Sequence, residues 1–158
     1  MPPTRSQTAS ANIPAIYRFL LLNVEPFCAF GGALLLVFAP TLYLNTMTRH
    51  TLTSMQPATE FIYTELLGGW LHFAFTEGIV LRLVDDYRVW RLLCTGMLLS
   101  DAAYVHSCAQ ALGGWNVWLQ VSGWTLDDWV VTLSTWPFLI ARLAIVSGVG
   151  CGMREKLE

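Results

Sequence analysis

Long apolar runs separated by short polar segments form the main pattern along the chain. A helix needs about 20 predominantly apolar residues to cross a bilayer core of roughly 30 Å, and four runs reach that length. The pattern predicts transmembrane helices over residues 15–38, 61–84, 89–112 and 129–151. It therefore predicts an all-α protein, a polytopic membrane four-helix bundle built from residues 13–152.

The polar segments between these runs define the predicted connections. Residues 40–60 form a polar loop, whereas the short segment 85–88 predicts a tight hairpin between the second and third helices. Residues 113–128 hold three tryptophans among glycines and contain no Lys or Arg. Both ends are polar, so we predict a disordered N-terminal tail over residues 1–12 and a cytosolic tail over residues 153–158.

Composition agrees with a membrane environment. Of the 158 residues, 54% are hydrophobic and 13% are charged, against roughly 25% charged in ordinary soluble domains. The net charge of -2 leaves no basic face for nucleic acid, and zinc-finger and glycine-rich phosphate motifs are absent. The four cysteines lack CxxC spacing, so we interpret them as packing residues. No metal, cofactor or nucleic-acid partner is predicted.

The positive charges predict how the helices are oriented, because Lys and Arg accumulate on the cytosolic side of membrane proteins. Seven of them lie on the side of the tails and the 85–88 hairpin, namely Arg5, Arg18, Arg82, Arg88, Arg91, Arg154 and Lys156. Only Arg49 lies on the opposite side, and Arg142 lies within the fourth helix. We therefore predict that both chain ends face the cytosol.

Ionisable residues interrupt all four predicted helices. A charge at the bilayer centre costs on the order of 2.5–3.5 kcal/mol, so each one calls for a reason. The residues concerned are Glu25 in the first helix, Glu65, His72 and Glu77 in the second, Asp101 and His106 in the third, and Arg142 in the fourth. Such groups are stable when they point into the bundle, so the sequence predicts a buried polar pocket.

The predicted pocket is centred on the second and third helices. Glu65, Gly69, His72 and Thr76 share one stripe by their helical spacing, and Asp101 lies at a similar depth on the third helix. Two glycine pairs, at 31–32 and 68–69, would let backbones approach or leave room for a ligand.

Structural roles are an alternative for several of these residues. Arg142 is expected to serve as a counter-ion to Glu25 or Glu77, because an unpaired buried guanidinium is untenable. Glu25 precedes Pro26 and would alternatively satisfy backbone groups that the proline leaves free. Glu25, Glu77 and Arg142 are therefore assigned to charge balance.

Carboxyl and imidazole groups in a low-dielectric pocket suit proton transfer near neutral pH. The HxxxH and ExxH spacings of zinc or di-iron sites are absent, as is the GxSxG elbow of serine hydrolases. The pattern favours cofactor-free acid–base chemistry on a lipophilic molecule: epoxide opening, cyclisation or double-bond isomerisation. Asp101 is the predicted general acid or base, with His72 and His106 as partners and Glu65 in support.

Three short motifs carry a family resemblance: Ile13-Pro14-Ala15-Ile16-Tyr17-Arg18 with Glu25-Pro26, Leu81-Arg82 to Asp86-Tyr87-Arg88-Val89-Trp90-Arg91, and Ser100-Asp101 to His106-Ser107. They resemble a fungal family of small integral membrane proteins found in secondary-metabolite pathways. Some members resemble proposed epoxide hydrolases or cyclases of citreoviridin- and aurovertin-like polyketide routes. The resemblance implies an endoplasmic-reticulum enzyme acting on a polyketide or terpenoid intermediate. It marks Glu25, Asp86, Arg88, Asp101 and His106 as positions of the family pattern.

A non-enzymatic membrane accessory or scaffold protein is the competing hypothesis. It predicts that the buried charges pair with one another and leave no space for a ligand, whereas a lined cavity open to lipid favours an enzyme. A proton or ion conductor is a third hypothesis, which would need a continuous water path from Glu65 through His72 to Glu77. Homodimerisation or association with other pathway enzymes is compatible with each of these.

Overall fold

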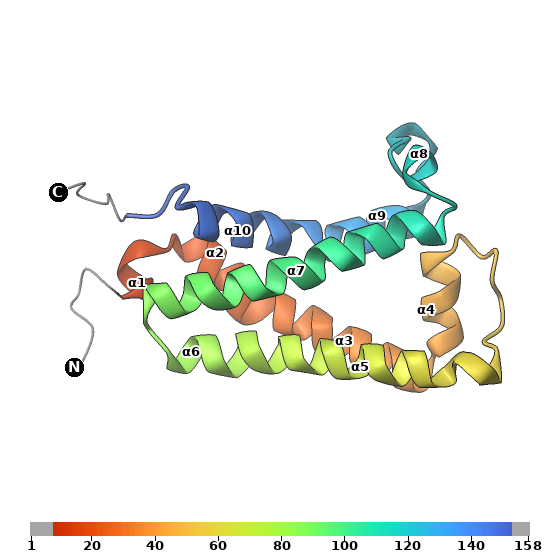
Figure 1. Ribbon diagram of the computed structural model, residues 1–158, viewed down its shortest axis with the longest axis horizontal. Helices are drawn as coiled ribbons and strands as arrows, with labels where there is room; N and C mark the ends of the chain where they lie inside the picture. Colours follow the sequence, from red (N-terminus) through yellow and green to blue (C-terminus); the bar gives the residue numbers. More distant parts are fainter. Residues whose placement is uncertain (1–7, 153–158) are drawn as a thin grey trace.

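The computed structural model describes residues 8–152, and within that range every regular element is helical (Figure 1). The longer elements are α2 (Ala15–Phe19), η2 (Leu20–Val24), α3 (Glu25–Phe38), α4 (Pro40–Met47), α5 (Glu60–Phe75), η4 (Thr76–Val80), α7 (Tyr87–Ala111), α9 (Leu126–Leu133) and α10 (Trp136–Ser147). The short ones are α1 (Ala9–Asn12), η3 (Pro57–Thr59), α6 (Leu81–Leu83), α8 (Trp115–Trp118) and η5 (Val121–Gly123). The predicted all-α class is confirmed.

Four long rods make up the body of the molecule. The first runs through α2, η2 and α3, and it packs along the second rod, made of α5, η4 and α6. The third rod, α7, packs along α10. Figure 1 shows the two pairs lying one above the other, with the ends of the described chain at one end of the bundle. At the opposite end, α4 contacts α9 and connects the pairs.

Local signals explain where the rods begin and end. The first stops at Ala39, directly before Pro40. Asp86 caps α7, because its side chain accepts hydrogen bonds from the backbone N–H groups of Arg88 and Val89. The last rod ends at Gly148, whose φ of +76° is the left-handed conformation that glycine adopts without a steric penalty. These bounds lie within a few residues of the predicted ones.

Two of the rods, Ala15–Phe38 and Leu126–Ser147, are long and apolar enough to cross a membrane. The second of these is interrupted after Leu133, and it resumes at Trp136 with Pro137 in the first turn of α10. Pro137 has no N–H, so it is tolerated only where a helix begins.

Two segments that the sequence marked as irregular are helical. Residues 40–47, in the predicted polar loop, form α4, which Pro40 starts. Residues 9–12, in the predicted disordered tail, form α1. Ser10 of α1 donates from its backbone N–H and its hydroxyl to the Asp85 carboxylate, at 2.7 and 2.6 Å. This contact attaches α1 to the hairpin, which the polar composition alone did not reveal. The rest of the predicted tails, residues 1–7 and 153–158, lies outside the described residues.

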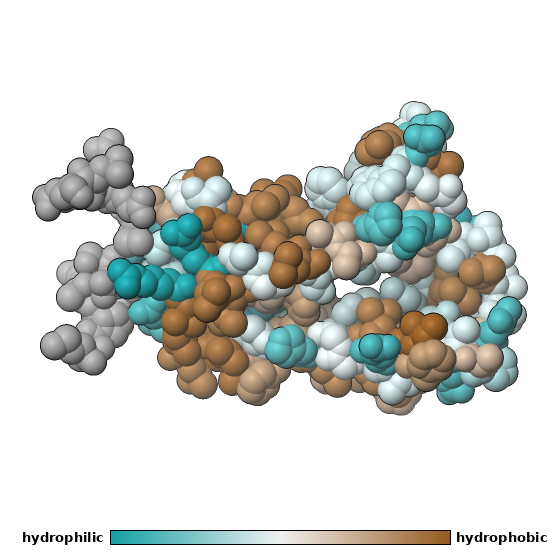
Figure 2. Space-filling model, in the orientation of Figure 1, coloured by the Kyte–Doolittle hydropathy of each residue, from teal (hydrophilic) through white to brown (hydrophobic). Residues whose placement is uncertain are grey.

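The packed core is concentrated toward the end of the bundle that holds the described chain ends. Leu21, Leu81, Trp90, Cys94 and Ile145 are almost fully buried there and come from all four rods. Large apolar side chains also cover the outside, including Phe27, which is 84% exposed. Figure 2 shows these brown apolar patches spread over the face of the molecule. An apolar outer surface of this extent requires a covering environment.

Candidate functional site

The centre of the bundle holds a cluster of one guanidinium and three carboxyl groups. Arg142 of α10 is completely buried, with 0% of its side chain exposed. Its Nη2 lies 2.5 Å from Glu25 Oε1 and 2.6 Å from Glu77 Oε1. Its Nη1 lies 2.6 Å from Asp101 Oδ2. Each residue of this Arg142 cluster comes from a different rod, so the cluster joins all four.

Irregular helix geometry brings two of the carboxyl groups to Arg142. Glu25 directly follows the π-helical segment η2, and Glu77 lies within the π-helical segment η4. The two segments contact each other. A π-helical turn adds a residue and rotates the side chains that follow it, and such turns are frequent at functional sites. Here they occur at the two glutamates that reach the same guanidinium.

The charges of the cluster do not balance. Three carboxyl groups face one guanidinium, so two negative charges would remain uncompensated if every carboxyl group were ionised. Glu25 Oε1 and Glu77 Oε1 both contact the same Arg142 nitrogen, and the other carboxyl oxygen of each residue is buried without a hydrogen-bond partner among the described residues. Neighbouring carboxylates in an apolar interior disfavour each other's ionised form. The Glu25–Glu77 pair is therefore expected to retain a proton.

An aromatic ring faces the cluster, and its three carboxyl groups are exposed to different extents. The Phe73 ring faces the guanidinium, with the Arg142 Cζ 5.2 Å from the ring centroid. The Glu77 side chain is completely buried, whereas Glu25 and Asp101 keep 11% and 7% of their side chains exposed. A molecule that approached the cluster would meet Glu25 or Asp101 before Glu77.

Either Glu25 or Glu77 was the predicted partner of Arg142, and in the structure both of them pair with it. Asp101, the predicted general acid or base, is a third partner. Asp101 therefore belongs to the same cluster as Glu25, Glu77 and Arg142, which were assigned to charge balance. The predicted catalytic residue and the predicted structural residues are not separate sites in the structure.

The predicted stripe on the second helix does not form the pocket. Glu65, Gly69 and His72 are exposed, and only Thr76 of that stripe is buried. At about 100° per residue, Glu77 lies roughly 140° around the helix from His72. The two side chains cannot both face the bundle axis, and the buried position belongs to Glu77 because Arg142 pairs with it.

His106 also lies away from the cluster. It is exposed near the far end of α7, where its ring packs against Trp115 with centroids 5.8 Å apart. Trp115 contacts Trp118 edge to face, and Trp118 in turn stacks on Trp136. None of the hydrogen bonds or ion pairs at the Arg142 cluster, as far as the described residues go, involves Glu65, His72 or His106.

One of the predicted glycine pairs does permit close packing. A Cβ atom on Gly32 would lie 2.1 Å from a ring carbon of Trp70, so the α3–α5 contact depends on glycine at this position. Gly31, Gly68 and Gly69 have no neighbour within 4 Å of an added Cβ. The glycines at 68–69 therefore do not bring backbones together among the described residues.

A second polar contact was not anticipated from the sequence. Arg49 Nε donates to both carboxylate oxygens of Asp128, at 3.1 and 2.9 Å. Asp128 also accepts from the backbone N–H and the hydroxyl of Thr125, in a capping box at the start of α9. The T-x-x-D spacing before an apolar run was the local signal for this cap. Its pairing with Arg49 ties the α4 end of the molecule to α9.

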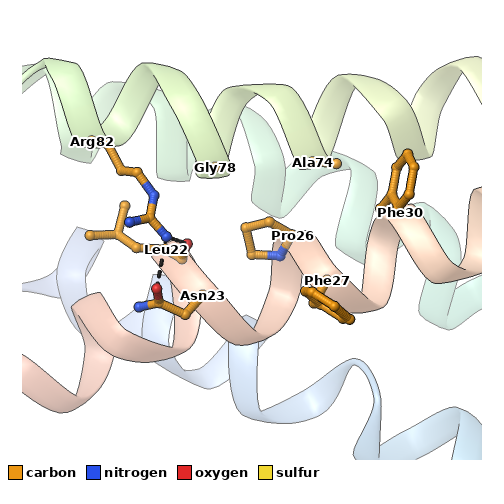
Figure 3. A pocket seen from close by; sticks show the side chains of 8 residues that line it. All are labelled: Leu22, Asn23, Pro26, Phe27, Phe30, Ala74, Gly78 and Arg82. Atoms are coloured by element: carbon orange, nitrogen blue, oxygen red, sulfur yellow. Dashed lines mark hydrogen bonds between the residues drawn. The ribbon is translucent and has the colours of Figure 1, made fainter.

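Within residues 8–152, no group of three or more His, Cys, Asp or Glu side chains is placed to hold a metal ion. A groove of about 420 Å³ lies between the first and second rods (Figure 3). It does not include the carboxyl groups of the cluster, but Pro26 and Gly78 in its wall directly follow Glu25 and Glu77 in sequence.

Residues 10–152 match a family described as a domain of unknown function (DUF7704). The chain belongs to this family. The part of the chain that the family covers contains all four residues of the Arg142 cluster and the whole groove of Figure 3. Comparison with curated proteins and with solved structures finds no match.

Proposed function

We propose that the chain crosses a membrane four times, with both ends in the cytosol. The 25-residue α7 alone is about 37 Å long by its helical rise, which exceeds a bilayer core of roughly 30 Å. Arg82, Arg88 and Arg91 lie at the end of the bundle where the described chain begins and ends, as the positive-inside rule requires. The apolar outer surface supports the same placement. The resemblance favours the endoplasmic reticulum.

Within that membrane, the protein is proposed to catalyse cofactor-free acid–base chemistry on a lipophilic molecule. The observation that carries this is the buried pair of Glu25 and Glu77, two carboxyl groups that share one nitrogen of Arg142 and leave an oxygen each without a partner among the described residues. Such a pair favours the state in which one carboxyl group is protonated. A carboxylic acid kept protonated inside an apolar bundle can protonate a weak base such as an epoxide oxygen. The family resemblance supplies the substrate class, an epoxidised polyketide or terpenoid.

The proposed reaction uses the two reachable carboxyl groups. The Glu25–Glu77 pair donates its proton to the epoxide oxygen as a C–O bond breaks. Water, or a hydroxyl group of the same molecule, attacks the carbon, and Asp101 accepts the proton that this nucleophile loses. A proton passing back through the cluster restores the starting state. Water gives a diol, and the internal hydroxyl group gives a cyclic ether.

Access for a lipophilic substrate is proposed from the side. Figure 2 shows the face hollowed between the α5 and α7 edges, in the half of the bundle away from the described chain ends. A side opening between helices would let a membrane-dissolved molecule approach without crossing the aqueous phase. Glu65 and His72 are exposed on α5 and are proposed to act, at most, on the path to the cluster.

A non-enzymatic accessory role is the second candidate, and one observation favours it. Arg142 contacts all three carboxyl groups, so the buried charges are mutually engaged, as a purely structural cluster requires. Such a cluster would hold the four rods together for association with other pathway proteins.

Deletion of the gene followed by metabolite profiling separates the two candidates. For the enzyme, deletion accumulates a lipophilic epoxide or alkene, and reintroduced Asp101→Asn or Glu77→Gln protein fails to consume it although it is present in the membrane. Reintroduced Glu60→Gln, at an exposed carboxylate that begins the same rod as Glu77, serves as the matched control and restores turnover. Full restoration by Asp101→Asn and Glu77→Gln would sink the enzymatic proposal and support the accessory role.

A further inference from the structure

The groove between the first and second rods has a polar end and an apolar end. It has a volume of about 420 Å³ and is open to the outside of the bundle. Its lining residues are Leu22, Asn23, Pro26, Phe27, Phe30, Ala74, Gly78 and Arg82. Figure 3 shows Arg82 at one end and Phe30 at the other, with Pro26 and Phe27 between them. From Arg82 to Ala74 the groove follows the helix axis for about 12 Å.

Proline chemistry holds Arg82 at the polar end. Pro26 has no N–H, so it cannot donate to the carbonyl of Leu22 four residues earlier. Arg82 Nη2 donates to that carbonyl instead, and also to Asn23 Oδ1 at 2.7 Å. These two bonds fix the guanidinium over the first rod at the mouth of the groove.

No carboxylate of the described residues 8–152 neutralises the charge of Arg82. A guanidinium has five N–H donors, and both hydrogen bonds of Arg82 come from a single nitrogen. No ion pair that joins residues in the 8–152 range includes Arg82. The remaining donors are therefore available to an anion.

The other end of the groove is apolar and accessible. Phe27 is 84% exposed and Phe30 is 51% exposed. Gly78 has no side chain to fill the groove, so the groove keeps its depth between the two rods. The volume falls within the roughly 300–1,000 Å³ that is typical of small-molecule sites.

We propose that this groove binds an anionic membrane phospholipid, with its phosphate at Arg82 and Asn23 and an acyl chain along Pro26, Phe27 and Phe30. The inference rests on the proposed membrane insertion and orientation. In that orientation the groove runs parallel to lipid chains and its cationic end faces the cytosolic leaflet, where anionic lipids are enriched. Basic pockets between transmembrane helices on this side bind lipid headgroups.

The lipid would lie directly behind the Arg142 cluster. Pro26 and Gly78 form the groove wall, and each directly follows a glutamate of the cluster. Glu25 comes directly after the π-helical segment η2, and Glu77 lies within η4. A bound lipid would therefore hold η2 and η4 together from the outside. Ligands that bind only the folded state raise the unfolding temperature, so the same lipid is expected to stabilise the purified protein.

Native mass spectrometry of the detergent-purified full chain tests the proposal, with equal amounts of phosphatidylserine and phosphatidylcholine added. Wild type is expected to retain phosphatidylserine preferentially, and only this lipid raises the unfolding temperature. Arg82→Gln lowers retained phosphatidylserine about fivefold, the worth of one basic side chain near a membrane surface, whereas Arg82→Lys keeps the preference. Ala74→Phe, which fills the apolar end, lowers retention of both lipids.

Arg88→Gln is the matched control, because it removes an exposed arginine at the same end of the bundle, one that does not line the groove. Equal retention of the two lipids by wild type overturns the proposal, as does an equal loss in Arg88→Gln and Arg82→Gln. Membrane insertion is measured separately, by resistance to carbonate extraction. A protein that resists extraction but shows no lipid preference refutes the groove alone and leaves the proposed function standing.

Discussion

Arg142 and Asp101 lie 41 residues apart in sequence, yet Arg142 Nη1 donates to Asp101 Oδ2 at 2.6 Å in the centre of the bundle. This bond links α10 to α7, and the other terminal nitrogen of the same guanidinium links α10 to both rods of the other helix pair. A planar guanidinium with separated donors can bridge in this way, whereas the single ammonium of lysine cannot reach three directions with the same geometry. Arg142 is therefore the residue on which the arrangement of the four rods depends.

Replacement of Arg142 by leucine is expected to destabilise the fold severely. It leaves three buried carboxyl groups without the one cation that pairs with them among residues 8–152. Breaking a buried ion pair from one side typically costs about 3–5 kcal/mol. Arg142→Lys should recover part of this loss. Thermal unfolding of the detergent-solubilised protein measures the effect, with Arg88→Leu as a control on an exposed arginine. A small shift for Arg142→Leu, similar to that of Arg88→Leu, would contradict the structural role.

Neutralising one glutamate is expected to cost far less than removing the arginine. Glu77→Gln keeps a hydrogen-bond acceptor for Arg142 and supplies N–H donors toward Glu25, while it removes one of the excess negative charges. We expect a change of about 1 kcal/mol or less in the free energy of unfolding, measured by the same thermal assay. A loss as large as that of Arg142→Leu would mean that all three carboxyl groups are ionised and needed as such, contrary to the shared proton.

Pro26 and Arg82 are expected to be energetically coupled. Proline at position 26 has no N–H to offer the Leu22 carbonyl four residues earlier, and Arg82 donates to that carbonyl. Pro26→Ala restores a backbone N–H, so Arg82→Gln should destabilise the protein less in that background than in wild type. A double-mutant cycle on unfolding free energies should give an interaction energy of about 0.5–3 kcal/mol. Strict additivity of the two substitutions would show that Arg82 does not replace the missing donor.

The helices were largely predictable because single residues in the local sequence determine where they begin and end. Pro40 stops the first rod, Asp86 caps the third, and Gly148 ends the fourth through a left-handed backbone. Helix α1 was not predictable in this way. Its attachment depends on the Ser10–Asp85 hydrogen bonds, between residues 75 positions apart.

The sequence predicted that ionisable residues form a buried site, but it predicted only some of the residues that meet there. Ionisable residues in apolar runs stand out in any sequence, and Glu25, Asp101 and Arg142 do meet. The sequence alone did not show which face of the second rod points into the bundle. Glu77 and His72 lie roughly 140° apart around the helix, and each is a polar residue within an apolar run. The choice depends on Arg142 from a distant rod and on π-helical turns that have no sequence signature.

Accessibility from the two sides of the membrane tests the proposed four spans directly. In a variant in which the four native cysteines are replaced, single cysteines are placed at Leu52, Arg88 and Val121, which lie in or beside the connections between rods and are exposed. In sealed vesicles of known orientation, a membrane-impermeant maleimide should label positions 52 and 121 from the lumenal side and position 88 from the cytosolic side. Detergent permeabilisation is the control, since it should make all three positions equally reactive. Labelling of 52 and 121 from opposite sides would mean that the number of crossings between them is odd, and a four-span arrangement would then be untenable.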